Sequence, residues 1–254
     1  MAMNLSSEGH ALVEKLGALG FERFRRALSA LALSFFAIVY SFLAVNAPEG
    51  WGPAFAALGV CYAVAFFAVV AEWFWGRWFA TGIGWSGLMV AIISLVMIGW
   101  VPALLVYGGI HALIVVPLAG KSMAARYDLQ EDWRKRYRMD DLGVARLRKT
   151  ITRSAASLPS LILWALGPKD PGQGMLLLVS LALLGLGLGG LVRARTWGWL
   201  AVAGAAGAAA VGGGVFGMRS FAGFAGPELA IAFLIAAVVP FTLPAIRFLR
   251  ARSA

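Results

Sequence analysis

Long runs of apolar residues are the feature that most constrains the fold of this chain. Apolar residues fill 61% of the 254 positions, and charged residues only 13%. A helix that crosses a bilayer needs about 20 mostly apolar residues, whereas a soluble domain spreads its apolar residues as stripes or alternating patterns. The sequence therefore predicts an all-α, polytopic bundle of transmembrane helices. Seven runs approach the required length: 27–45, 53–71, 81–98, 101–119, 174–191, 198–218 and 227–246.

An eighth span is predicted at residues 154–166, although this stretch is short and contains Pro159. With eight spans, all 22 lysines and arginines except Lys169 and Arg219 lie on the cytoplasmic side. Basic residues concentrate in cytoplasmic loops, so this distribution favours eight spans with both termini in the cytoplasm. Without the span at 154–166, every later loop changes sides, and five arginines face outward: Arg193, Arg195, Arg247, Arg250 and Arg252.

The spans and charges divide the chain into five parts. Residues 1–26 are expected to form an amphipathic cytoplasmic helix, and residues 248–254 a basic tail. Two four-helix halves, 27–119 and 154–247, flank a basic cytoplasmic loop at 120–153. Short outer loops and the strong bias of basic residues fit a bacterial inner (cytoplasmic) membrane. The lipid bilayer is therefore the first expected partner.

The central loop has the pattern of a helix that lies on a membrane surface. Leu129, Trp133 and Tyr137 recur every four residues and so share one helical face. We expect this face to enter the inner leaflet while the intervening basic residues meet anionic lipid headgroups. Those residues are Arg134, Lys135, Arg136 and Arg138.

Two further expectations concern the same loop. A second short helix is expected after the first, capped by Asp140 or Asp141. A cytoplasmic partner protein is the alternative occupant of the aromatic face. Nucleic acid is not expected as a partner, because membrane topology already explains where the basic residues lie.

Glycine pairs in the second half point to close helix packing. Gly185 and Gly189 form one GxxxG pair, and Gly213 and Gly217 form another. Small residues let helix backbones approach closely inside a membrane. We expect these pairs to pack the spans 174–191 and 198–218 within the protein, and a contact with a partner membrane protein is the alternative.

Few polar residues fall inside the predicted spans. His111 is deep in a span and follows Tyr107 by one helical turn. Such a histidine is expected to be a hydrogen-bonded structural residue facing the bundle, or else a contact for a ligand. If the chain binds or transports a solute or lipid, the candidate contacts are Tyr40, Tyr62, Tyr107 and His111.

One short motif raises a catalytic alternative. Gly84-Trp85-Ser86-Gly87 resembles the serine motif of rhomboid intramembrane proteases, over four residues. The resemblance implies an intramembrane serine hydrolase in which Ser86 is the nucleophile and His111 its base. The chain departs from that family because the two residues lie on adjacent helices near the inner face, and because an upstream His/Asn pair for the oxyanion is missing.

No cofactor or metal site is predicted. Cys61 is the only cysteine, and His10 and His111 are the only histidines, so neither a cysteine-rich metal site nor a bis-histidine haem is expected within one chain. The leading hypothesis is an integral membrane protein without a catalytic site, acting as an accessory or scaffold subunit or binding a hydrophobic ligand or lipid. A transporter and the serine hydrolase are the alternatives.

Overall fold

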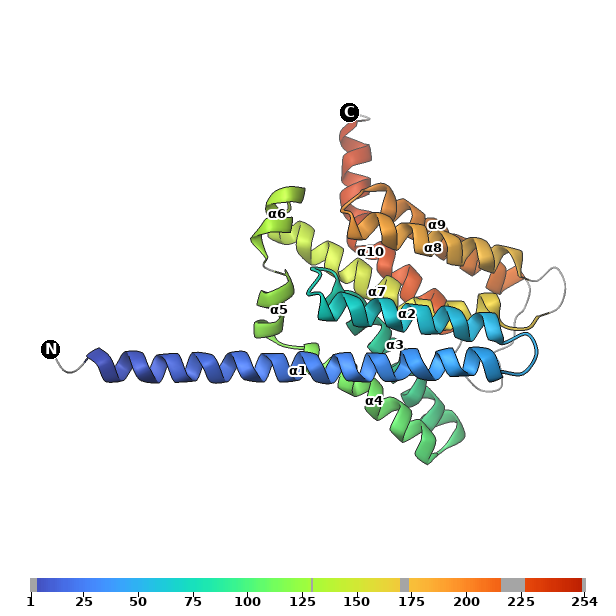
Figure 1. Ribbon diagram of the computed structural model, residues 1–254. Helices are drawn as coiled ribbons and strands as arrows, with labels where there is room; N and C mark the ends of the chain where they lie inside the picture. Colours follow the sequence, from blue (N-terminus) through green and yellow to red (C-terminus); the bar gives the residue numbers. More distant parts are fainter. Residues whose placement is uncertain (1–3, 129, 170–173, 216–226, 253–254) are drawn as a thin grey trace.

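The computed structural model describes residues 4–128, 130–169, 174–215 and 227–252, and every regular element in these ranges is a helix. Figure 1 shows the bundle, from which the N-terminal part of the longest helix projects. The helices are α1 (Asn4–Asn46), α2 (Gly52–Val70), α3 (Gly76–Ile98), α4 (Pro102–Leu118), α5 (Lys121–Asp128), α6 (Glu131–Tyr137), α7 (Asp141–Leu166), α8 (Met175–Val192), α9 (Trp197–Val215) and α10 (Pro227–Arg252).

The chain is all-helical with four to five candidate membrane spans. Four helical segments are long and apolar enough to cross a membrane: Gly20–Asn46, which is the second part of α1, and the whole of α2, α3 and α8. A fifth arises if α4 and α5 are counted as one span, although the chain bends by 73° between them. Within the described residues, α9 and α10 contain shorter apolar stretches. The count of eight spans therefore stays a prediction.

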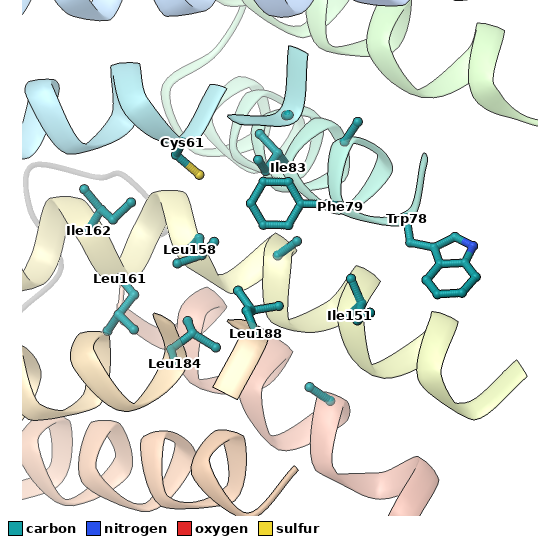
Figure 2. Packing of buried hydrophobic residues seen from close by; sticks show 14 of the residues in the cluster. Cys61, Trp78, Phe79, Ile83, Ile151, Leu158, Leu161, Ile162, Leu184 and Leu188 are labelled. Carbon is teal, nitrogen blue, oxygen red and sulfur yellow. The ribbon is translucent and has the colours of Figure 1, made fainter. Parts of the chain in front are cut away.

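Helix α7 occupies the centre of the bundle. It packs against α2 and α3 on one side and against α8 and α10 on the other, as Figure 1 shows. Side chains from α7 join the two sides into one core (Figure 2). The α7 side chains labelled in that view are Ile151, Leu158, Leu161 and Ile162. They lie between Cys61, Phe79 and Ile83 on one side and Leu184 and Leu188 on the other.

The position of α7 explains the unusual composition of residues 154–166. Between Ser154 and Ala165, every side chain except Leu163 is buried. A helix shielded by protein on all sides does not need a lipid-compatible surface, so serines are tolerated there. This segment is also not a separate short helix, because α7 starts at Asp141 in the central loop and continues without a break. The side chain of Asp140, one of the two predicted caps, accepts the hydrogen bond from the Gly143 amide.

The connecting segments gather at two ends of the bundle. At one end, one groove is lined by Trp73 between α2 and α3, by Tyr137 of α6 and by Arg193 between α8 and α9. At the opposite end, Gly50 lies against the ring of Pro168 and Gly167 against the indole of Trp51. The α1–α2 and α7–α8 connections are therefore together, away from the segments expected in the cytoplasm.

Prolines inside two helices free backbone carbonyls that other helices bind. A proline lacks the N–H that would donate to the carbonyl four residues before it. In α4, Pro117 releases the Leu113 carbonyl, and the Ser29 hydroxyl of α1 lies 3.3 Å from that oxygen and 3.1 Å from the next. In α10, Pro240 releases the Ala236 carbonyl, to which Arg153 of α7 donates across 2.7 Å.

The close contact between α8 and α9 uses other glycines than the predicted pairs. Gly187 and Gly190 of α8 meet the backbone of Gly198, where added Cβ atoms would clash. Gly185, by contrast, is exposed and has open space around it, and Gly189 lies near only the Arg193 side chain. Gly213 is near the end of α9, and Gly217 is outside the described residues.

Candidate functional site

His111 lies at the junction of four helices and is completely buried. The ring of Phe36, on α1, packs against the imidazole with their centroids 4.1 Å apart. Gly87, on α3, faces the same ring: a Cβ at this position would lie 2.0 Å from Cδ2 of His111. The imidazole therefore occupies the space that a side chain at residue 87 would need.

Both ring nitrogens of His111 are hydrogen-bonded. Nδ1 lies 2.8 Å from the Tyr107 carbonyl oxygen, and Nε2 lies 2.8 Å from the hydroxyl of Tyr62, on α2. A carbonyl oxygen can only accept, so Nδ1 carries a proton. In the neutral ring Nε2 has none, and it accepts the hydrogen bond from the Tyr62 hydroxyl.

The structure brings the four predicted ligand contacts together. Tyr107 packs on His111 with ring centroids 4.3 Å apart, and Tyr40 lies 5.4 Å from the Tyr62 ring. Phe36, which lies on α1, contacts the rings of all four of these residues. Tyr62 and His111 are completely buried, whereas Tyr40 and Tyr107 are partly exposed. The cluster is an aromatic junction between α1, α2 and α4 with two edges open to the surroundings.

Ser86 and His111 are not connected by a hydrogen bond. The Ser86 hydroxyl is buried and has no hydrogen-bond partner, while Nε2 of His111 is engaged by Tyr62. A serine nucleophile needs its base within hydrogen-bond reach. In the Gly84–Gly87 motif, the residue that contacts His111 is Gly87, and its lack of a side chain leaves room for the imidazole ring.

A second polar cluster lies where the central loop meets the bundle, around the buried carboxylate of Asp128. Arg77 pairs with this carboxylate across 2.9 Å, and the indole of Trp78 donates to it across 2.7 Å. Arg148 of α7 lies 3.5 Å from the same group. Arginine and carboxylate compensate each other's burial, so Asp128 joins α3, α5 and α7. This role could not be predicted from the sequence, because Asp128 belongs to no motif.

Glu72 forms the neighbouring part of this cluster. It pairs with Arg26 of α1 and, across 2.8 Å, with Arg126 of α5. Beside it, the Tyr127 hydroxyl donates to the Val69 carbonyl across 2.8 Å. Burial raises the pKa of Tyr127 above its ordinary value, and the nearby arginines oppose this shift. The α2–α3 connection is thus tied to the central loop.

The aromatic face of α6 has a protein partner. Trp133 is buried, and its ring stacks on Phe74 with centroids 4.2 Å apart. The ring of Tyr137 also packs on Phe74, with centroids 6.2 Å apart. These two side chains therefore pack against the α2–α3 connection of the protein itself. The sequence predicts instead that they enter the inner leaflet. The amphipathic pattern is the same for a helix on lipid and for a helix on apolar protein, and the pattern alone does not separate them.

The basic residues of α6 have different surroundings. Arg134 pairs with Asp141, and Lys135 pairs with Glu131. Arg136 and Arg138 are exposed, and no ion pair involves either of them among the described residues.

Arg136 faces a pocket that contains two further arginines. The pocket has a volume of about 480 Å³ and is lined by Arg136, Tyr137 and the turn Arg193-Ala194-Arg195. Among the residues that the structure describes, none that lines this pocket carries a carboxylate. Ala194 holds a left-handed φ of 55°, and the Arg195 amide donates to the Gly190 carbonyl across 2.9 Å, which closes the C-terminal end of α8. A hydrogen-bonded turn therefore presents two arginines beside a third.

A separate apolar groove adjoins this pocket. It has a volume of about 560 Å³ and shares Ala194 and Arg195 with the arginine pocket. Its other walls come mainly from α7, α8, α9 and α10 and include Leu147, Trp199, Leu200 and Phe241. In the sequence, Arg193 and Arg195 indicate only the topology. The groove could not be predicted, because its walls come from helices that are far apart in the chain.

Within the described residues, no three histidine, cysteine, aspartate or glutamate side chains are grouped so that they could hold a metal ion. Comparison of the chain with family models, curated proteins and solved structures gives no match. Function is therefore inferred from the geometry of the chain's own residues.

Proposed function

We propose that this chain is an eight-span protein of the bacterial inner membrane that acts by binding. Its role is that of an accessory or scaffold subunit, or of a protein that holds a hydrophobic ligand or lipid, and it catalyses no reaction. Both termini lie in the cytoplasm. The gathering of the α2–α3 connection, α6 and the α8–α9 turn at one end of the bundle supports this topology.

The hydrogen bonding of His111 is the observation that carries the proposal. A catalytic base needs a free nitrogen within reach of the group it deprotonates. In His111, Nδ1 is bonded to the backbone of its own helix and Nε2 to Tyr62 of another helix. The interior histidine is thus used to join helices, which suits a static membrane scaffold.

The test is purification from native membrane in mild detergent, followed by mass spectrometry of all proteins and lipids that remain bound. We expect a partner protein or a lipid at a fixed ratio to the chain. Turnover of a lipid or peptide by the purified chain alone would contradict the proposal. A fluorophosphonate probe, with Ser86→Ala as its control, checks the hydrolase separately: labelling that depends on Ser86 would also contradict it.

The convergence of the aromatic junction favours one second candidate, a transporter of a small solute or lipid. Tyr40 and Tyr107 are partly exposed beside the buried Tyr62–His111 pair, so a ligand could reach the junction from its edge. Flux through proteoliposomes tests this function. Loss of flux in Tyr107→Phe and His111→Ala, but not in the matched Tyr127→Phe, would favour transport. Equal flux in all three would remove the junction from that role.

A further inference from the structure

We infer that the arginine pocket and the apolar groove together form a binding site for one anionic phospholipid of the inner leaflet. This inference rests on the proposed function and names the class of ligand. The phosphate would lie among Arg136, Arg193 and Arg195, and an acyl chain would follow the groove toward Leu200 and Phe241.

Charge is the first reason. Three exposed arginines line one pocket without a carboxylate, and no ion pair involves them among the described residues. Like charges held together repel one another unless an anion lies between them. Arginine also matches phosphate geometry, because its planar group donates two parallel hydrogen bonds. Tyr137 also lines this pocket.

The apolar groove that adjoins the arginine pocket is the second reason. A soluble anion would use only the arginine pocket, whereas the adjoining groove is lined mainly by apolar side chains, including Leu147, Leu191 and Leu200. The two spaces share Ala194 and Arg195. A ligand that fills both must have a negative head and an apolar tail, which is the chemistry of an anionic phospholipid.

Depth in the membrane is the third reason. Trp197 begins α9 beside the arginine turn and is half exposed, and Trp73 is half exposed at the same end of the bundle. Exposed tryptophans favour the headgroup level of a bilayer. The inner leaflet carries the anionic lipids, and basic side chains at its surface are attracted to them.

The experiment is native mass spectrometry of the purified full-length chain with added phosphatidylglycerol or phosphatidylcholine. We expect one tightly held phosphatidylglycerol and weaker binding of phosphatidylcholine. The double variant Arg193→Gln/Arg195→Gln should bind phosphatidylglycerol about tenfold more weakly. The matched control Arg23→Gln/Lys149→Gln removes two exposed charges that do not line the arginine pocket and should bind like the parent chain.

Two further arms separate other ligands from phospholipid. Leu200→Asn, at an exposed groove position, should weaken phosphatidylglycerol binding, and soluble glycerol phosphate should not displace the lipid. Displacement by glycerol phosphate, no effect of Leu200→Asn, or equal weakening in the charge control would each overturn the site. So would a co-purifying protein that is lost from the Arg193→Gln/Arg195→Gln variant while phosphatidylglycerol binding is unchanged.

Failure of the site and failure of the proposed function give different results. If the chain binds both lipids equally but still retains a partner protein or a lipid from the native membrane, the phospholipid site is wrong and the proposed function stands. Thermal unfolding of each variant in detergent shows whether the fold is intact. The substituted side chains are exposed, so we expect unchanged midpoints.

Discussion

The hydroxyl of Tyr62 and Nε2 of His111 lie 2.8 Å apart, with both side chains completely buried between α2 and α4. Neither group has access to water, so each depends on the other for its hydrogen bond. This pair is the polar centre of the aromatic junction, and the aromatic rings of Phe36 and Tyr107 pack against it.

Tyr62→Phe should destabilise the protein. The substitution leaves Nε2 of His111 buried without a donor, and an unsatisfied buried polar group costs about 1–3 kcal/mol. Thermal or denaturant unfolding of the purified variant measures the effect. Tyr137→Phe, in a partly exposed position on α6, is the matched control and should cost less. An unfolding free energy unchanged by Tyr62→Phe would show that the pair is not a stabilising contact.

Gly87→Ala should lower stability because the new methyl group would overlap the His111 ring. Overpacking a buried contact costs about 1–3 kcal/mol, and the imidazole is fixed at both nitrogens, so it cannot move away freely. Gly185→Ala is the control: it lies in a helix with open space around it, and alanine is favoured there by about 0.5–1 kcal/mol. Unfolding midpoints should therefore shift in opposite directions, and equal shifts would contradict the packing at Gly87.

Arg153 and Pro240 should be energetically coupled. Arg153→Met removes the donor to the Ala236 carbonyl that Pro240 has freed. In a Pro240→Ala background, the new amide at residue 240 can donate to that carbonyl, so the same substitution should cost less. Contacting residues show coupling of about 0.5–3 kcal/mol in a double-mutant cycle. Lys149→Met, at an exposed position of the same helix, should show none. A Pro240→Ala background that leaves the cost of Arg153→Met unchanged would contradict this account of the freed Ala236 carbonyl.

The helical, apolar character of the chain could be predicted from sequence because it depends on local composition. The runs at 27–45, 53–71, 81–98 and 174–191 reappear in helices long enough to cross a membrane. The part played by α7 could not be predicted in this way. Hydropathy measures compatibility with lipid, and the C-terminal half of α7 is enclosed by other helices.

Some residues of the aromatic junction stand out in the sequence for a related reason. His111 and the three tyrosines stood out because polar groups are rare in apolar spans, and they do converge. Gly87 and Asp128 act through partners from other helices, His111 for the first and Arg77 for the second. Such contacts depend on tertiary packing, and neither residue belongs to a pattern that specifies its partner.

The central claim is an eight-span protein whose arginine pocket and apolar groove face the inner leaflet. Its most direct test is to find on which side of the membrane Lys169 and Thr196 lie. In a Cys61→Ala background, single cysteines at Glu49, Lys169 and Thr196 are treated with an impermeant maleimide on spheroplasts. We predict labelling of Glu49→Cys and Lys169→Cys in intact spheroplasts, and of Thr196→Cys only after permeabilisation. Labelling of Thr196→Cys in intact spheroplasts, with Lys169→Cys protected, would show that residues 154–166 do not cross the membrane and would place the groove on the outer side.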